Sequence, residues 1–231
     1  GMGRMGRMIR DCAADRGIEV AAEFNTATIA QLAQCDRMDA VIDFSAPASL
    51  PALAAYVQRT GTPLVSGTTG YCDEEAARVN ALGSYAPVAL SANFSIGVAV
   101  LKHLAAEAAA LLPDFDIEII ETHHRMKKDA PSGTAKLLLS AVNPDGTHPT
   151  VFGREGFTPR TAGEIGVHAV RGGTVAGVHT VSFFGDEEEL SLTHRAESRR
   201  IFAIGALKTA EKLKDAPVGL HTLDELLFAR R

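Results

Sequence analysis

The sequence predicts an α/β protein with two parts: a doubly wound parallel sheet, followed by an α+β region around a mixed sheet. Through residues 1–90, short apolar runs alternate with amphipathic helical stretches, which is the rhythm of a parallel sheet. From about residue 95 a long helix precedes a series of short strands, which suit a mixed and mostly antiparallel sheet.

In the first part, the expected strands are short and largely apolar, as buried parallel strands are. Strands are expected at residues 17–22, 40–44, 63–66 and 87–90, and helices at 28–34, 48–60 and 74–82. Ligands of doubly wound sheets bind beyond the carboxyl ends of the strands. The residues that follow these strands are therefore candidate ligand contacts.

The start of the chain carries a glycine pattern. Gly1, Gly3 and Gly6 match G-x-G-x-x-G, in which glycines let a pyrophosphate approach the N-terminus of a helix, here residues 7–16. This pattern should follow a strand, and no residues precede it here, so we expect a Rossmann-like nucleotide-binding sheet that lacks its first strand. Glycines before a helix also form plain turns, so the pattern alone is weak.

An acidic residue lies at the distance expected for a dinucleotide site. Glu23 follows the glycines by about twenty residues, where a carboxylate binds the adenine ribose hydroxyls. A solvent-exposed strand end would look the same. Phe24 follows it in place of an arginine for a 2′-phosphate, which favours NADH, although Arg4 or Arg7 could approach that phosphate.

In the second part, helices are expected at residues 97–112, 135–142 and 202–214, and strands at 115–120, 166–170, 179–184 and 189–193. Arg171-Gly172-Gly173 is interpreted as a hairpin connection. The strand at 115–120 is expected to end where an unusual polar cluster begins.

This cluster reads Glu-Thr-His-His-Arg-Met-Lys-Lys-Asp-Ala-Pro-Ser-Gly-Thr-Ala over residues 121–135. Hydroxyl groups and unpaired N–H groups at a helix start bind carboxylates, and Arg125, Lys127 and Lys128 add positive charge. The cluster predicts a site for a small dianion with proton donors nearby. Taken singly, the His-His-Arg run could be a solvated loop end and Ser-Gly-Thr an N-cap.

Taken together, the string closely resembles the signature of the 4-hydroxy-tetrahydrodipicolinate reductase (dihydrodipicolinate reductase) family of lysine and diaminopimelate biosynthesis. The resemblance extends over essentially the whole chain. Gly67-Thr68-Thr69 is similar to the family's Gly-Thr-Thr near the nicotinamide, and Ser91-Ala92-Asn93-Phe94 to its cofactor-contacting Ala-Ala-Asn-Phe. One departure is Val178 before His179, where the family normally has an acidic residue.

The resemblance implies NAD(P)H-dependent reduction of a cyclic imine that bears two carboxylates. It aligns His123 with the acid–base histidine, Lys127 with the proton-donating lysine, and His124 with a substrate contact. Gly133 and Thr134 align with the carboxylate-binding pair, and Ser132 is expected to be a cap with a secondary ligand role. Lys127 could instead act by its charge alone. The expected cofactor-binding residues are Gly1, Gly3, Arg4, Met5, Gly6, Glu23, Gly67, Thr68, Thr69, Ser91, Ala92, Asn93 and Phe94.

The resemblance also implies how the chain divides. Residues 1–94 and 205–231 would form the dinucleotide-binding domain, and residues 95–204 the substrate-binding and oligomerisation domain of a homotetramer.

Two alternatives to the reductase function are another Rossmann dehydrogenase, of the aspartate or homoserine dehydrogenase type, and a non-catalytic nucleotide-sensing relative. The first alternative lacks the cluster, and the second predicts binding without turnover.

Bulk properties exclude several other classes of protein. A net charge of −5 makes no electrostatic case for a nucleic-acid or anionic-membrane partner, and no apolar run is long enough to cross a membrane. Cys12, Cys35 and Cys72 are an odd number without paired spacing, which indicates free thiols in a reducing cytoplasm. No signal peptide is expected, and no metal site, since C-x-x-C and H-E-x-x-H are absent.

Overall fold

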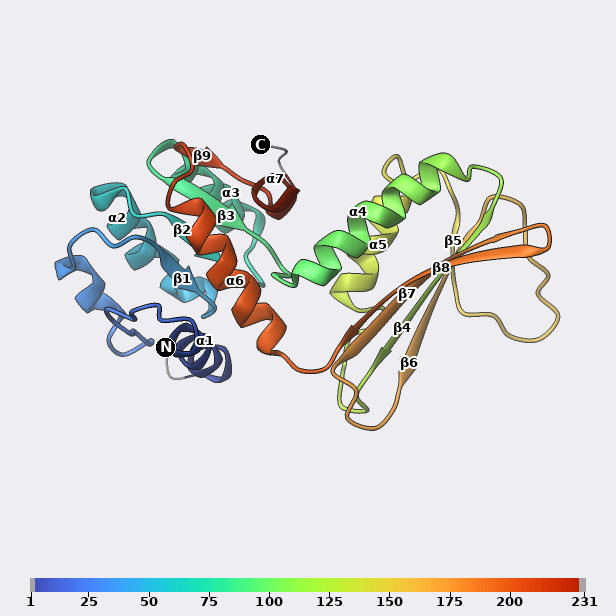
Figure 1. Ribbon diagram of the computed structural model, residues 1–231, viewed down its shortest axis with the longest axis horizontal. Coiled ribbons are helices and arrows are strands. Elements are labelled where there is room, and N and C mark those ends of the chain that lie inside the picture. The colour runs from blue at the N-terminus through green and yellow to red at the C-terminus, as the bar shows by residue number, and fades with distance from the viewer. Residues whose placement is uncertain (1–2, 229–231) are drawn as a thin grey trace. The chain divides into compact units, whose positions relative to one another are not determined.

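The computed structural model describes residues 3–228, which form two compact units (Figure 1). The first unit combines the chain up to Ile96 with the chain from Arg200 onward, and the second comprises Gly97–Arg199. These boundaries lie within a few residues of the expected ones. The roles expected for the two units stay predictions.

The first unit contains a four-stranded sheet in the order β1-β2-β3-β9, and every neighbouring pair is parallel. The strands are β1 (Val41–Asp43), β2 (Leu64–Ser66), β3 (Pro87–Leu90) and β9 (Gly219–Leu220). The predicted parallel sheet is therefore confirmed. The two-residue strand β9 is not predicted, because so short a pairing leaves no pattern in the sequence.

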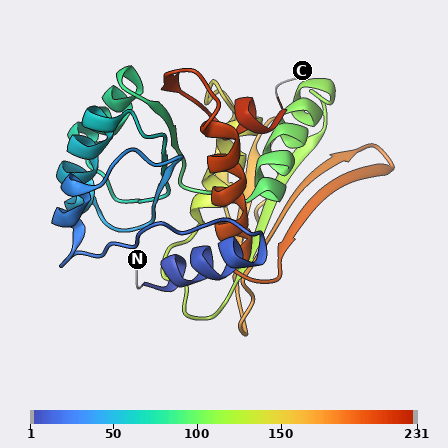
Figure 2. The same ribbon diagram turned by 60° about the vertical axis from the view of Figure 1, so that its left-hand side comes forward.

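Helices cover both faces of this sheet. The helices of the unit are α1 (Arg4–Asp15), α2 (Leu50–Thr60), α3 (Asp73–Ala81), α6 (Arg200–Leu213) and α7 (Leu223–Phe228), with 3-10 helices η1 (Ile29–Gln34), η2 (Pro47–Ser49) and η3 (Leu82–Ser84). Helices α1 and α6 lie side by side in both views (Figures 1 and 2) and pack with Ile42 of β1. Helices α2 and α3 pack on the opposite face, because successive side chains of a strand point to opposite sides.

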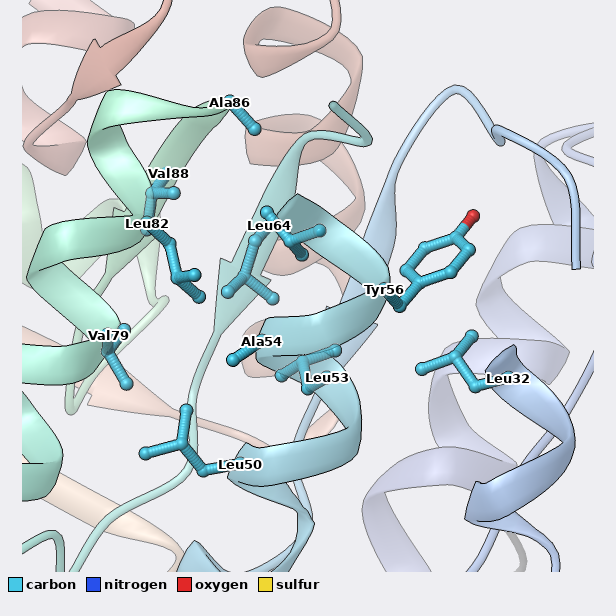
Figure 3. Close-up of a cluster of buried hydrophobic side chains, with 11 residues drawn as sticks. Leu32, Leu50, Leu53, Ala54, Tyr56, Leu64, Val79, Leu82, Ala86 and Val88 are labelled. Atoms are coloured by element: carbon cyan, nitrogen blue, oxygen red, sulfur yellow. The ribbon is translucent and has the colours of Figure 1, made fainter. Parts of the chain in front are cut away.

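The core on the α2 face joins apolar side chains from several elements (Figure 3). Leu50, Leu53 and Tyr56 of α2 are almost fully buried beside Val88 of β3. The hydroxyl of Tyr56 donates to a backbone carbonyl and accepts from Thr62, so its burial leaves no polar atom unpaired. Each such leucine contributes about 1.5–3 kcal/mol through the hydrophobic effect.

The predicted strand at residues 17–22 is wrong. The N–H of Ile18 donates to Ala13 O at the end of α1, and the residues after it are irregular and largely exposed. A strand needs a neighbour to pair its backbone groups, and within residues 3–228 the strand β1 pairs only with β2. The glycine pattern falls partly outside the described residues, since it begins at Gly1.

The second unit is built on a five-stranded sheet in the order β5-β6-β4-β7-β8. Its strands are β4 (Asp116–His123), β5 (Thr150–Phe152), β6 (Ile165–Arg171), β7 (Gly177–Gly185) and β8 (Glu188–Ala196). The mixed sheet is confirmed, but the expectation that it is mostly antiparallel is wrong. The pairs β5–β6 and β6–β4 are parallel, whereas β4–β7 and β7–β8 are antiparallel.

Helices α4 (Ile96–Leu111) and α5 (Gly133–Val142) supply apolar side chains to a core that they share with the strands. Figure 1 shows both helices on the same side of the sheet. No helix within residues 3–228 is long and apolar enough to cross a membrane.

Two local predictions in this unit are wrong. Strand β4 does not end at Ile120 but continues to His123, so the polar cluster begins inside the sheet. Residues 171–173 are not a hairpin connection, because β6 and β7 lie on opposite sides of β4. The segment passes the end of β4 instead, where Gly172 N–H donates to His123 O and Arg125 N–H donates to Gly173 O.

Candidate active site

Strand β4 places the first residues of the cluster in the interior of the second unit. Alternation along the strand puts Glu121 and His123 on the same face as the buried Ile119, and this is the face that packs against α4 and α5. Glu121 has no exposed surface and His123 is 8% exposed. A carboxylate is rarely buried so completely without partners.

Glu121 has three partners. Its Oε2 lies 2.5 Å from His123 Nδ1, both carboxylate oxygens accept from Arg171 at 2.8 Å, and Oε1 accepts from Ser132 N–H at 3.0 Å. Burial acts to raise the pKa of Glu121, but the hydrogen bonds from Arg171, His123 and Ser132 outweigh it and hold the pKa below its ordinary value. Glu121 is therefore a stable anion at neutral pH.

Burial lowers the pKa of His123 below 6.5, even though the carboxylate of Glu121 opposes that shift. The imidazole is therefore mainly neutral at pH 7. Because Nδ1–H is the donor that the carboxylate requires, Nε2 carries the lone pair. A Cβ added at Gly177 would lie 3.1 Å from Nε2, so the glycine leaves space beside this nitrogen. At neutral pH, His123 can accept a proton at Nε2 but has none to donate there.

The cations of the cluster follow in the turn after β4. Lys127 Nζ lies 2.9 Å from Asp129 Oδ1, and this hydrogen bond lowers the pKa of Asp129. The carboxylate of Asp129 is therefore the nearest counter-ion of the Lys127 ammonium. His124 is half-buried, and Arg125 and Lys128 are exposed.

The N-terminus of α5 begins directly after this turn. Ser132 is its N-cap: the hydroxyl oxygen accepts from Ala135 N–H at 3.1 Å, which confirms the expected capping role. The same oxygen lies 3.1 Å from His179 Nε2, and Ser132 is 2% exposed. Gly133 is exposed and Thr134 half-buried, and no acidic residue lies in the first turn. The helix start can therefore receive an anion at Gly133 and Thr134.

The expected cofactor residues of the first unit follow two neighbouring strands. Gly67-Thr68-Thr69 comes directly after β2, and Ser91-Ala92-Asn93-Phe94 after β3. The two segments therefore lie at one edge of the sheet, as expected for a nucleotide site.

Some of these side chains are engaged within the protein. Thr68 is 4% exposed; its hydroxyl donates to Asp43 Oδ2 at 2.7 Å and accepts from Ser45 N–H at 2.9 Å. Phe94 is 1% exposed and packs edge-on against Phe44 with ring centroids 5.6 Å apart. These two residues would therefore contribute backbone atoms, rather than side chains, to a ligand site.

The N-terminus of α1 suits a phosphate group. Its N-cap, Gly3, has an extended conformation, the helix has no side-chain cap, and its first turn holds no acidic residue. The first backbone N–H groups of Arg4, Met5 and Gly6 are thus the donors that a pyrophosphate requires. Glu23 lies 3.5 Å from Arg10 of the same helix, measured from Oε1 to Nη1.

The sequence does not predict three residues of the second-unit site: Glu121, Arg171 and His179. The alternation of β4 could have indicated Glu121, because it lies two residues before His123 on the same face. Arg171 and His179 come from β6 and β7, which flank β4. Only the strand order brings them to the cluster. The described residues include no group of three or more potential metal ligands.

Known protein families match the chain over nearly its whole length. Family models described as dihydrodipicolinate reductase, N-terminus and C-terminus, match residues 1–94 and 97–227. A 4-hydroxy-tetrahydrodipicolinate reductase of Exiguobacterium sp. is 42% identical over 98% of this chain and 93% of the relative. The 4-hydroxy-tetrahydrodipicolinate reductase of Clostridium tetani is 40% identical over 97% of this chain and 93% of the relative.

Solved structures show the same fold. A dipicolinate-bound dihydrodipicolinate reductase from Paenisporosarcina sp. TG-14 aligns with a TM-score of 0.76 at 21% identity, over 98% of this chain and 96% of that one. An amine dehydrogenase from Mycobacterium smegmatis aligns with a TM-score of 0.64 at 10% identity, over 100% of this chain and 95% of that one.

The match to these reductases, together with the parallel sheet of one unit and the mixed sheet of the other, places the chain in a class of two-unit, nicotinamide-dependent oxidoreductases. The family models cover nearly the whole chain and the relatives are about 40% identical over nearly their full length. The chain belongs to the dihydrodipicolinate reductase family.

Proposed function

We propose that the protein reduces 4-hydroxy-tetrahydrodipicolinate, a cyclic imine dicarboxylate, to tetrahydrodipicolinate with NAD(P)H, in lysine and diaminopimelate biosynthesis. The observation that carries this proposal is the carboxylate of Glu121, which binds both His123 and the N-cap residue of α5, Ser132. A proton-handling group and an anion-binding helix start are thereby held together in one unit.

The substrate carboxylates would bind at the start of α5. The exposed backbone of Gly133 and the half-buried Thr134 supply donors there, and Lys127 and His124 add positive charge or a further hydrogen bond. An anion at this position also gains from the helix dipole, by about 0.3–1 kcal/mol for an exposed group. Ser132 would act mainly through its cap, because its hydroxyl oxygen already has two protein partners.

Lys127 would supply the proton that the ring nitrogen gains on reduction. Its Nζ donates to Asp129 Oδ1, whereas Nε2 of His123 has no proton to donate in the tautomer that Glu121 requires. After the transfer, the amine of Lys127 regains a proton from solvent. His123 would serve as the acid–base partner, since a bound dianion favours protonation of its free Nε2.

The residues of the first unit fit a nicotinamide dinucleotide, which supplies a hydride when bound. The uncapped start of α1, preceded by Gly3, would hold the pyrophosphate, and Glu23 the adenine ribose, while Gly1 lies outside the described residues. Gly67–Thr69 and Ser91–Phe94 would line the nicotinamide end.

NADH is the favoured form of the cofactor, because the carboxylate of Glu23 would repel the 2′-phosphate of NADPH. A tighter dissociation constant for NADPH than for NADH, measured by fluorescence titration, would contradict this preference.

The homotetramer and the cytoplasmic location also remain proposals. Apolar side chains on the sheet face opposite α5 support the assembly: Ile120, Val170 and Phe184 are each at least 40% exposed. Light scattering on the purified protein tests the oligomeric state directly. The three free cysteines suit a reducing compartment.

The decisive test is oxidation of NADH with substrate generated in place from pyruvate and aspartate semialdehyde, followed by loss of dihydronicotinamide absorbance. His123→Ala and Lys127→Ala are each expected to lower kcat about 100-fold or more. A folded wild-type protein that binds NADH but does not turn over this substrate would overturn the proposed activity.

A further inference from the structure

His179 is a buried histidine that the proposed chemistry leaves unused. In β7 it stands opposite Glu121 of β4 on one side and His194 of β8 on the other. It is 4% exposed, and its ring lies edge-on to that of His123, with centroids 5.0 Å apart. It is therefore beside the proposed acid–base residue but turned toward another partner.

That partner is Ser132, the N-cap of α5. His179 Nε2 lies 3.1 Å from the Ser132 hydroxyl oxygen, while Glu121 Oε1 accepts the backbone N–H of the same serine at 3.0 Å. Ser132 is thus held at two atoms by two neighbouring strands. Since Glu121 also binds His123, the position of the helix start is tied to the position of the imidazole.

The ring of His179 is neutral at neutral pH. Burial, helped by the charge of His123, lowers its pKa to about 4. Nδ1 is buried without a hydrogen-bond partner among residues 3–228. A buried N–H without a partner is rare in proteins, so the proton belongs on Nε2, where it is donated to Ser132. The serine oxygen then accepts two hydrogen bonds, and its own hydrogen stays available for a ligand oxygen.

We propose that His179 is a positioning residue for the substrate carboxylate. By holding the Ser132 hydroxyl, it fixes the position of the backbone donors of Gly133 and Thr134 relative to the imidazole of His123. This inference rests on the proposed function, since it assumes that the start of α5 receives a carboxylate. It assigns His179 no contact with the reacting atoms. Its effect would therefore fall on the binding of dicarboxylates and not on the binding of NADH.

The test compares His179→Leu, which removes the hydrogen bond, with His179→Gln, whose side-chain amide can still donate near the Nε2 position. The ligand is dipicolinate, titrated by calorimetry, and the substrate KM and kcat are measured in parallel. His179→Leu is expected to weaken dipicolinate binding about tenfold and to raise KM similarly, as for one lost hydrogen bond. His179→Gln should restore most of the loss, and the dissociation constant of NADH should not change in either variant. His148→Leu is the matched control, because His148 also makes one ring-nitrogen hydrogen bond in this unit, to Gly163 O.

A double-mutant cycle with Ser132→Ala distinguishes positioning from general loss of packing. If His179 acts through Ser132, then His179→Leu adds little in the Ser132→Ala background. Unchanged dipicolinate binding in a folded His179→Leu protein would overturn the inference, and so would a full additive loss in the double variant. If His179→Leu does not fold, His179→Phe takes its place in the cycle, because it keeps a ring but cannot donate to the Ser132 hydroxyl, and full additive losses there overturn the inference equally. A wild-type protein that neither binds dipicolinate nor turns over substrate overturns the proposed function itself, and this inference with it.

Discussion

Nδ1 of His123 lies 2.5 Å from Oε2 of Glu121, a carboxylate with no exposed surface. Two residues apart on one strand, the two side chains share the face of β4 that packs against the helices. Since Arg171 neutralises the carboxylate from β6, the negative charge can be buried and still orient the imidazole. The arrangement therefore depends on three residues, of which the sequence predicts only His123 as a site residue.

The first prediction concerns Glu121→Gln, which keeps the shape of the side chain and removes its charge. The imidazole of His123 loses its strongest partner and Arg171 loses its counter-ion. We expect kcat to fall about 100-fold. We also expect the free energy of unfolding to fall by about 2–3 kcal/mol, because Arg171 retains some access to solvent. Steady-state kinetics and urea unfolding measure the two effects.

Glu164→Gln is the matched control for that variant. Glu164 is also a buried carboxylate of the second unit and pairs with Arg154, but it lies outside the site. It should lose stability and retain kcat. If Glu121→Gln retained kcat as well, the orienting role of this carboxylate would be wrong.

The second prediction separates proton donation from charge at Lys127. Lys127→Arg keeps a cation that can pair with Asp129, but a guanidinium does not release a proton near neutral pH. Lys127→Met removes the charge as well. We expect both variants to lose kcat about 100-fold, whereas only Lys127→Met should bind dipicolinate more weakly. An arginine variant with near wild-type kcat would show that the positive charge alone suffices.

The third prediction concerns stability and pH. Because the pKa of His179 is about 4 in the folded protein and near 6.5 when unfolded, the unfolded chain binds a proton first as the pH falls. The contribution of His179 is fully present above pH 6.5 and is lost between 6.5 and about 4, by roughly 3 kcal/mol. The free energy of unfolding, measured with urea across this pH range, should depend more steeply on pH for the wild type than for His179→Gln. His123 and His194 shift in the same direction, so only the difference between the two proteins is diagnostic. Parallel pH dependences for both proteins would contradict a buried neutral His179.

The sequence predicts an element of the fold well when neighbouring residues determine that element, and poorly when a strand far away in the sequence does. Strand β3 has the expected bounds at residues 87–90, since an apolar run there is followed by polar residues. Residues 17–22 have a strand-like composition but no described neighbour to pair with, and composition cannot report that. The three-residue strand β5 depends wholly on its partner β6.

The site shows the same division. The helix start at Ser132–Thr134 follows from capping residues that are adjacent in sequence. The predicted end of β4 falls three residues early, because Glu121, Thr122 and His123 look like a polar loop. What makes them strand residues is Arg171, which lies fifty positions later and reaches Glu121 across the β4–β6 pair. Local patterning carries no trace of such a partner.

The last prediction concerns the cofactor end of the first unit and Gly67→Ala. A Cβ at this position would lie 2.3 Å from Cε1 of Phe44, whose ring packs on the buried Phe94. The ring must move, which costs about 1–3 kcal/mol as an overpacked site and displaces the segment after β2, Gly67–Thr69, which is proposed to contact the nicotinamide. We expect a lower melting temperature and weaker NADH binding, with dipicolinate binding unchanged because the residues proposed to bind dipicolinate belong to the other unit.

Gly172→Ala serves as the control, since a Cβ there would meet no heavy atom within 4 Å and the φ of this glycine is unstrained. Phe44→Leu added to Gly67→Ala should recover part of the stability by making room for the methyl group. Unchanged NADH affinity in the single variant would show that this glycine is not needed at the cofactor site.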